Sequence, residues 1–229
     1  MPMKGSGQSE LREIDRWEDG VGWIAYPDEE MQRASHAFVA DDGSVWVVDP
    51  VDADGVDDLL AEFGDVAGVV VMLDRHKRDA ADVANRHDVS VYVPDWMADV
   101  ASEIEAPVER FGRELADTGY QALTVRDSVV PPWQEVGLYH EESGTLVVPE
   151  SVGTADYFLA PGERLGVHPM LRLFPPERQL GRLSPERILV GHGEGVTEDA
   201  TSALRDALDG ARRRTPALYG KTLRTFISG

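Results

Sequence analysis

The residues best suited to chemistry lie in one short polar run, Asp74-Arg75-His76-Lys77-Arg78-Asp79. A continuous apolar stretch at residues 67–73 precedes this run and predicts a buried strand, and a helical pattern begins at residue 77. Open α/β sheets bind their ligands at the carboxyl ends of their strands, so a site is expected at this turn. Its imidazole and carboxylate groups could ligate a metal ion or transfer protons.

A second histidine has a similar setting. His192 lies in a Gly-His-Gly turn, between a short apolar run and an amphipathic segment that begins near Thr197. That segment has an apolar stripe at helical spacing, acidic residues in its first turn and three arginines at 212–214. These features predict a helix that has Thr197 as its N-cap, ends near Arg214 and covers a sheet.

The elements that position these residues alternate along the chain, as in a mixed α/β fold. We predict a hairpin at 36–49 that turns at Asp42 and Gly43, followed by a helix at 56–63 with Asp54 as its N-cap. Strands at 67–73 and 89–93 then flank a helix at 77–87, and two short helices lie within 95–118. Three strands follow between 119 and 150, the last two forming a hairpin, and a loop-rich excursion or lid covers 150–185. No linker divides these elements. Residues 13–229 are therefore expected to form a single domain after a loose polar tail at residues 1–12.

Four segments, in their order, resemble the metallo-β-lactamase superfamily: WVVDPV, VVVMLDRHKRDA, VVPPWQEVGLYHEESGTLVVPES and ILVGHGEGV. The resemblance spans about residues 35–210. It implies the αββα sandwich of that family, which is α/β in class, or α+β by some schemes. It also implies a metal site built from H-x-H-x-D-H at a strand end, a later His, a bridging Asp and a final His in a Gly-His-Gly turn.

Carried over residue by residue, the family's metal motif is degenerate in this chain. Of its imidazoles, His76 and His192 remain. The other positions hold Asp74 and Asp79 in place of two histidines, Arg78 in place of the motif's Asp, Trp133 in place of the later His and Glu150 in place of the bridging Asp. The resemblance therefore predicts that the usual dinuclear zinc site is largely lost.

The remaining groups could form a reduced site. The predicted metal ligands are Asp74, His76, Asp79, Glu150 and His192, a set suited to one Zn, Mn or Fe ion if the fold brings them together. Such an ion would polarise a carbonyl or phosphoryl oxygen, and Asp79 or Glu150 would act as the catalytic base. The chain would then be a mononuclear metal-dependent hydrolase of unknown substrate.

Two alternatives stay open, because Lys77 and Arg78 place positive charge beside the site. In the first, no metal binds. Asp79 pairs with Arg75 or Arg78, His76 is a hydrogen-bonded buried residue, and the domain binds a small anionic ligand or a protein partner without catalysis. In the second, the chain forms a structural homo-dimer. Residues 161–229 carry 11 basic and 8 acidic groups, net +3, and could pair with the acidic remainder.

Composition narrows the function classes. The chain has 229 residues, is 42% hydrophobic and carries a net charge of −20, which argues against nucleic-acid or anionic-membrane partners. It has no Cys, so thiolate metal ligands and cysteine nucleophiles are excluded. Few lysines among many arginines and carboxylates favour a halophilic source. Without an apolar run near the roughly 20 residues of a membrane span, or a signal-peptide core, we expect a cytoplasmic protein.

Overall fold

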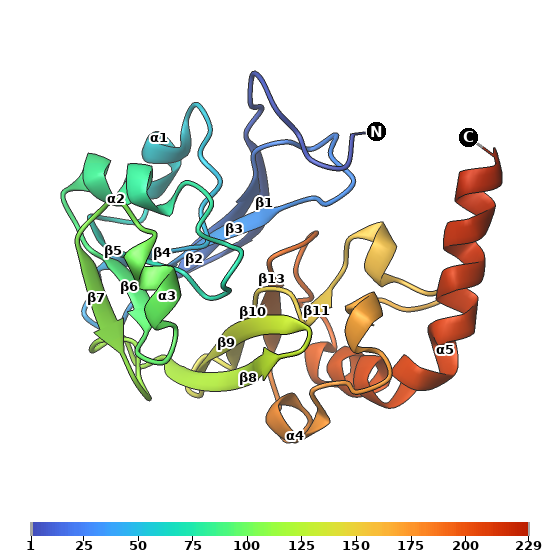
Figure 1. Ribbon diagram of the computed structural model, residues 1–229. Helices are drawn as coiled ribbons and strands as arrows, with labels where there is room; N and C mark the ends of the chain where they lie inside the picture. The colour runs from blue at the N-terminus through green and yellow to red at the C-terminus, as the bar shows by residue number, and fades with distance from the viewer. Residues whose placement is uncertain (1, 229) are drawn as a thin grey trace.

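The computed structural model describes residues 2–228, without the side chains of residue 222 and residues 224–228. Two β-sheets pack face to face, with helices on their outer sides (Figure 1). The first sheet contains, in spatial order, β1 (Arg12–Trp17), β2 (Gly20–Ile24), β3 (Ala34–Val39), β4 (Val45–Val48), β5 (Val66–Val70), β6 (Val91–Pro94) and β7 (Val108–Phe111). Its first four strands are antiparallel, and β4 to β7 are parallel.

The second sheet is smaller. It contains, in spatial order, β13 (Arg187–Val190), β10 (Thr145–Val148), β9 (Pro132–His140) and β8 (Gln121–Val129). The β13–β10 pair is parallel, whereas β10, β9 and β8 are antiparallel neighbours. Between β10 and β13 the chain forms only short elements: β11 (Val152–Gly153), η1 (Asp156–Phe158), β12 (Gly166–Val167), η2 (Pro169–Leu171) and α4 (Glu177–Leu180).

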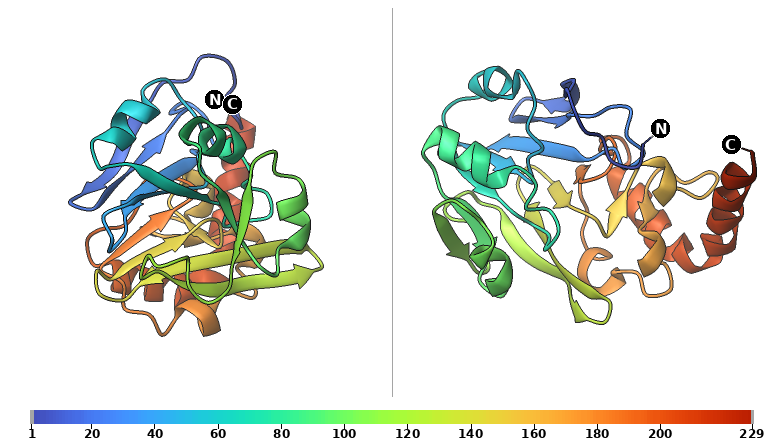
Figure 2. Two further views of the ribbon diagram at one scale, coloured as in Figure 1. Left: turned by 90° about the vertical axis from the view of Figure 1, so that its left-hand side faces the viewer. Right: turned by 45° about the horizontal axis from the view of Figure 1, so that its top comes forward.

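The helices lie on both sides of the paired sheets, as the second view of Figure 2 also shows. They are α1 (Val56–Ala61), α2 (Ala80–His87) and α3 (Ala98–Ser102) beside the first sheet, and α5 (Ala200–Ser228) beside the second. Side chains of β10 and β13 alternate between the two layers: Val147 and Leu189 pack in the cluster shared with the first sheet, and their neighbours Leu146 and Ile188 pack with α5. This period of two places one apolar face on each side of the strand pair. The αββα arrangement predicted from the resemblance is confirmed.

Several local predictions hold in the structure. The hairpin forms as β3 and β4, the strand–helix–strand unit as β5, α2 and β6, and the later hairpin as β9 and β10. Segment 95–118 differs. Its first predicted helix is α3, but its second is wrong, because Val108–Phe111 form the edge strand β7 paired with β6. Pairing with a neighbouring parallel strand overrides the weak local preference of a four-residue stretch.

The predicted helix ends are wrong in three places. Gly55, with φ of 92°, precedes α1 and no side chain caps that helix, so Asp54 is not the cap. α5 begins at Ala200, three residues after Thr197, and continues past Arg214 to Ser228. Arg214 does not mark the helix end. Its guanidinium instead donates to the carboxylate of Asp206, eight residues earlier in the same helix. α5 contains Pro216 and changes direction along its length (Figure 1).

The N-terminal residues, for which the sequence predicts a loose tail, are hydrogen-bonded to the fold. The carbonyls of Pro2 and Met3 accept N–H groups of residues 30 and 31, and the N–H of Gly5 donates to Glu29 at 2.7 Å. Glu29 is buried and pairs with Arg33, which directly precedes β3. No described helix is both long enough and apolar enough to cross a membrane.

Candidate metal site

Four strands, two from each sheet, end at one place in the fold. Asp49 directly follows β4, His76 lies in the loop after β5, Glu150 lies two residues after β10, and His192 lies two residues after β13. Because β4 and β5 are parallel, and β10 and β13 are parallel, each pair of loops leaves its sheet on the same side. The two sheets thereby bring four polar side chains from distant parts of the sequence to one site.

The imidazole of His76 is buried and oriented by a carboxylate. Its Nδ1 lies 2.8 Å from Oδ2 of Asp49, and Oδ1 of Asp49 accepts the N–H of Met72 at 2.9 Å. With Asp49 as the acceptor, His76 donates its Nδ1–H and keeps Nε2 unprotonated. A carboxylate behind a histidine is a common arrangement in metal sites, where it fixes the ring and the tautomer.

His192 is fully buried, and, as in His76, an acceptor at Nδ1 orients its ring. Its Nδ1 lies 2.8 Å from the carbonyl oxygen of Met31, which can only accept, so Nδ1 carries the proton. Its Nε2 has no hydrogen-bond partner. The ring packs against Tyr157 and Phe158, with centroids 6.0 and 5.8 Å away. A buried ring nitrogen with a free lone pair is an atom prepared for a ligand.

Glu150 supplies the carboxylate. Its Oε2 lies 3.6 Å from Nε2 of His76 and accepts a hydrogen bond from Arg75 at 3.2 Å. Buried Glu135 fixes the backbone behind it by accepting the N–H groups of Glu150 and Ser151 at 3.0 and 2.7 Å. Glu135 also accepts the indole N–H of Trp133 at 2.7 Å. The guanidinium of Arg75 stacks 4.3 Å above the Trp133 ring, so it is held over the Glu150 carboxylate.

Three of these side chains form a potential ligand set. One ligand atom each from His76, Glu150 and His192 lies within 4.8 Å of the other two, the one such group found among residues 2–228. Two ligands bound at about 2.1 Å lie at most about 4.2 Å apart, so a contraction of less than 1 Å would let all three reach one ion. Two imidazoles and one carboxylate suit Zn or Fe. The donor set therefore fits one metal ion.

Arg78 lies directly beside this ligand set. Its guanidinium donates to the carbonyl oxygens of Ala34 at 2.6 Å, Asp49 at 2.7 Å and Gly191 at 3.1 Å. The same group lies 3.4 Å from Nε2 of His76. Arg78 thus ties together the start of β3 and the ends of β4 and β13 with a fixed positive charge, which disfavours another cation.

Burial controls the charge of the cluster. Burial lowers the pKa of both His76 and His192 well below its usual value, and Arg78 lowers each further, so both rings are neutral at pH 7. Burial raises the pKa of Glu150 to about 7, against the opposing effect of Arg75. Burial likewise raises the pKa of Asp49 to about 7. Neutral imidazoles are the form that binds metals.

The structure brings together three of the five predicted ligands. Asp74 and Asp79 lie outside the group and are engaged elsewhere. The carboxylate of Asp74 accepts hydrogen bonds from Arg75 at 3.0 Å and from the N–H of Gln134 at 3.2 Å. Asp79 precedes α2, and its Oδ2 accepts the N–H of Asp52 at 2.8 Å. The five-residue ligand set as a whole stays a prediction.

The metal-free interpretation also needs a correction. The ion pair that it expects between Asp79 and Arg75 or Arg78 is absent from the described part of the chain. Arg75 pairs with Asp74 and Glu150, and Arg78 donates to backbone carbonyls, because both guanidinium groups turn toward the strand ends rather than toward α2. His76 is buried and hydrogen-bonded, as that interpretation expects.

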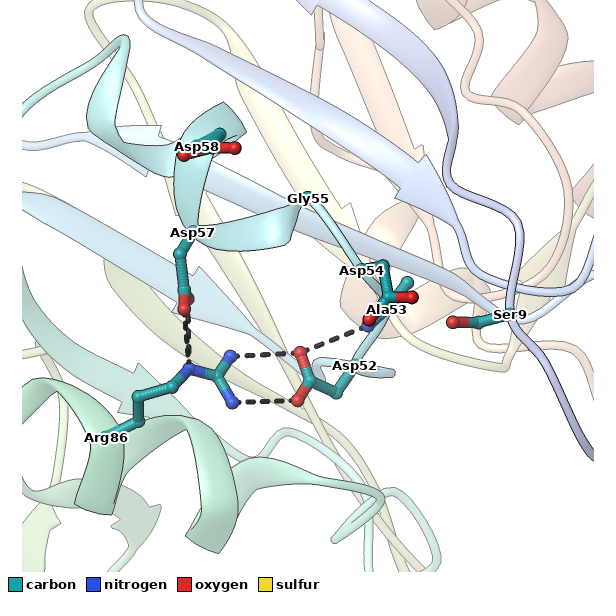
Figure 3. Close-up of a pocket in the computed structure, with 8 residues that line it drawn as sticks. All are labelled: Ser9, Asp52, Ala53, Asp54, Gly55, Asp57, Asp58 and Arg86. Atoms are coloured by element: carbon teal, nitrogen blue, oxygen red, sulfur yellow. Dashed lines mark hydrogen bonds and ion pairs between the residues drawn. The ribbon is translucent and has the colours of Figure 1, made fainter.

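A separate depression of about 450 Å³ lies beside α1 and α2 (Figure 3). Its wall carries four aspartates, at positions 52, 54, 57 and 58. Arg86 pairs with both oxygens of Asp52, at 2.8 and 2.9 Å, and with Asp57 (Figure 3). The arginine pairs with two of the four aspartates, and none of the four belongs to the group of His76, Glu150 and His192 that could hold a metal ion.

Sequence reasoning missed three residues of the site. Asp49 had a readable signal, since it is a polar residue at the carboxyl end of a predicted strand. Arg78 was noticed as a charge, but its three carbonyl partners could not be read from the sequence. His168 had no signal at all. It lies in the loop-rich segment, and the fold places its Nε2 3.5 Å from Oε1 of Glu150.

Comparisons with known proteins support the fold. No protein-family model and no curated protein matches this chain. Solved structures do. The DIM-1 metallo-β-lactamase exposed to ceftazidime aligns with a TM-score of 0.61 at 14% identity over 90% of this chain and 100% of its own. The flavodiiron protein from Giardia intestinalis aligns with a TM-score of 0.63 at 12% identity, over 89% of this chain and 60% of its own. The chemotaxis sensor ODP, solved as a peroxy diiron species, aligns with a TM-score of 0.56 at 14% identity, over 87% of this chain and 94% of its own.

The chain therefore has the metallo-β-lactamase fold. Its His76, Glu150 and His192 cluster lies at the strand ends of that fold and is compatible with one metal ion.

Proposed function

We propose that this chain binds one divalent metal ion through His76, Glu150 and His192 and is a mononuclear metal-dependent hydrolase. The observation that carries the proposal is the buried Nε2 of His192, which lacks a hydrogen-bond partner yet lies near the other two ligand atoms. Leaving a buried polar atom unpaired costs about 1–3 kcal/mol. A fold that retains such an atom within a donor set is consistent with ligation there.

The surrounding residues support this assignment by what they do to the ligands. Asp49 and the carbonyl of Met31 accept hydrogen bonds from Nδ1–H of the two imidazoles, which leaves both Nε2 atoms unprotonated. A bound ion supplies Lewis-acid chemistry, the polarisation of a carbonyl or phosphoryl oxygen. Of the two predicted catalytic bases, Asp79 and Glu150, only Glu150 lies at the cluster. Arg75, whose side chain is 41% exposed, could orient an oxygen-rich substrate at the rim.

Metal content tests the proposal directly. The protein is purified without an affinity metal column, stripped with a chelator and titrated with Zn²⁺, Mn²⁺ or Fe²⁺, with bound metal measured by elemental analysis and calorimetry. We expect one equivalent of bound metal, lost in His192→Ala and strongly weakened in Glu150→Gln. The matched control is His87→Ala, which removes a histidine of α2 that pairs with Asp57. Screening of esters, phosphoesters and lactones follows for the loaded protein.

A second candidate function rests on Arg78. Its guanidinium lies 3.4 Å from Nε2 of His76 and can donate to that lone pair, so the same atoms are also compatible with a metal-free site. The chain would then be a non-catalytic domain with the metallo-β-lactamase fold that binds a small anion or a protein partner. Metal content near zero after incubation with all three ions would reject the hydrolase proposal in favour of this candidate.

A further inference from the structure

The loop-rich segment between β10 and α4 has no regular element longer than three residues, yet it contributes a side chain to the site. His168 lies between β12 and η2. Its side chain is 13% exposed, and its Nε2 lies 3.5 Å from Oε1 of Glu150. Its ring lies edge-on to Trp133 and Phe158, with centroids 5.0 and 5.4 Å away. The ring is therefore held on two sides.

The hydrogen bond at Nδ1 of His168 determines which ring nitrogen carries the proton. Its Nδ1 accepts the backbone N–H of Met170 at 3.2 Å, which caps the start of η2. In the neutral ring the proton then lies on Nε2, the atom that faces the carboxylate. At 3.5 Å this is a polar contact with the carboxylate, longer than the 2.7–3.2 Å of an N–H···O hydrogen bond.

A buried ion pair fixes the backbone around His168. The guanidinium of Arg172 is fully buried and donates to both oxygens of Glu163. The same guanidinium donates to the carbonyl of Val167 at 3.1 Å and to that of Phe158 at 2.6 Å. Val167 directly precedes His168, so this network fixes the chain where the histidine leaves it.

The two oxygens of Glu150 thus have different partners. Oε2 faces His76 and accepts from Arg75, whereas Oε1 faces His168. An arginine and a carboxylate favour a bidentate pairing that uses both oxygens. Without a donor on Oε1, the Glu150 carboxylate would be free to rotate onto Arg75 and turn away from the imidazoles.

We infer that His168 is the positioning residue of this site, which holds Oε1 of Glu150 so that Oε2 faces His76 and His192. The segment that supplies it is then part of the site rather than a surface excursion. The inference rests on the proposed metal site, because the orientation of Glu150 matters for ligation. Groups that position metal ligands from behind typically contribute 10- to 100-fold in metal affinity.

Two substitutions separate this role from the capping of η2. In His168→Asn the side-chain oxygen can still accept the N–H of Met170, but no donor reaches Glu150. In His168→Gln the amide nitrogen reaches the place of Nε2 and can donate to Oε1. The Zn²⁺ dissociation constant of each chelator-stripped variant is measured by calorimetry, and the visible spectrum of the Co²⁺-loaded protein reports the ligand geometry. His87→Asn is the matched control for loss of a histidine.

We expect His168→Asn to bind Zn²⁺ about 10- to 100-fold more weakly and with an altered Co²⁺ spectrum, while His168→Gln stays within about threefold of the unaltered chain. Binding by His168→Asn equal to that of the unaltered chain would overturn the role of His168 and leave the metal proposal standing. Equal weakening in both variants would also overturn it, because loss of the cap or of the ring packing would then explain the effect. An unaltered chain that binds none of Zn²⁺, Mn²⁺, Fe²⁺ and Co²⁺ would overturn both proposals.

Discussion

Two arginines, the fully buried Arg172 and the half-buried Arg78, serve different purposes in this fold. Arg172 donates through all three of its nitrogens, to two carbonyls and to the carboxylate of Glu163, and both partners are completely buried. Arg78 leaves its Nε without a partner and lies beside His192, whose Nε2 also has none. Arg172, whose hydrogen-bonding groups all have partners, fixes a loop. Buried donors and acceptors without partners, as around Arg78 and His192, instead indicate where a ligand is expected to bind.

The largest effect is expected from breaking the completed network. Arg172→Met removes the fully buried cation of the Glu163 carboxylate and leaves it only the 3.5 Å contact with Arg214. Removing one partner of a buried ion pair costs about 3–5 kcal/mol. Urea unfolding measures the loss. Arg205→Met, on the exposed face of α5, is the control and is expected to change stability by less than about 0.5 kcal/mol. Equal stability of the two variants would remove the distinction between the two regions.

At the cluster of His76, Glu150 and His192, metal binding is expected to change the free energy of unfolding more than substitution does. At a free Zn²⁺ concentration 100 times the dissociation constant, binding stabilises the folded state by about 2.7 kcal/mol. Unfolding of the unaltered chain with and without Zn²⁺ measures this gain. His192→Ala is expected to lose the gain because it removes the unpartnered Nε2. A gain that persists in His192→Ala would place the bound metal elsewhere.

Arg78 gives a sharper test because two measured quantities are expected to move in opposite directions. Arg78→Met removes the donors to three strand-end carbonyls and lowers the free energy of unfolding by about 2 kcal/mol. It also removes a positive charge beside the cluster and raises Zn²⁺ affinity on the order of tenfold. Urea unfolding and calorimetry measure the two effects. If stability and affinity fell together, Arg78 would instead be needed to assemble the ligand set.

The Glu29–Arg33 pair is a further buried ion pair whose contribution to stability can be measured as a function of pH. Burial would raise the pKa of Glu29, but hydrogen bonds from Arg33 and from the N–H of Gly5 outweigh burial and hold the pKa below its usual value. A lowered carboxylate pKa stabilises the fold above the unfolded pKa of about 4.3, and this contribution is lost as pH falls further through the folded pKa. Glu29→Gln is expected to cost about 1–2 kcal/mol at pH 6 and progressively less below pH 4.3. Urea unfolding across that range measures it, and a cost independent of pH would show that the charge of Glu29 does not contribute.

Much of the fold could be predicted because it follows local patterns. The β3–β4 hairpin and the β5–α2–β6 unit were readable from apolar runs separated by turn residues. β7 was not, since four residues acquire strand character only through pairing with β6. The end of α5 was also misplaced. From the sequence alone, an arginine that ends a helix cannot be distinguished from one that, like Arg214, pairs with a carboxylate within the helix.

The residues of the candidate site also divide into those that the sequence identifies and those that only the fold reveals. His76 and His192 could be found because each follows an apolar strand, and the resemblance to a known family identified Glu150. Asp74 and Asp79 share a turn with His76, but turn residues two or three positions apart point in different directions, so proximity in sequence does not decide ligation. His168 is 18 residues from Glu150 in a segment without periodicity, and nothing in its neighbours indicates a contact.

The sequence by itself therefore determined the order of the elements and the two imidazoles, because these depend on residue type and local spacing. The tertiary structure decided which side chains converge. It placed Arg78 among three carbonyls, Asp49 behind His76 and His168 beside Glu150. The physical reason is that convergence depends on how two sheets pair and pack, and those contacts join residues from distant parts of the chain.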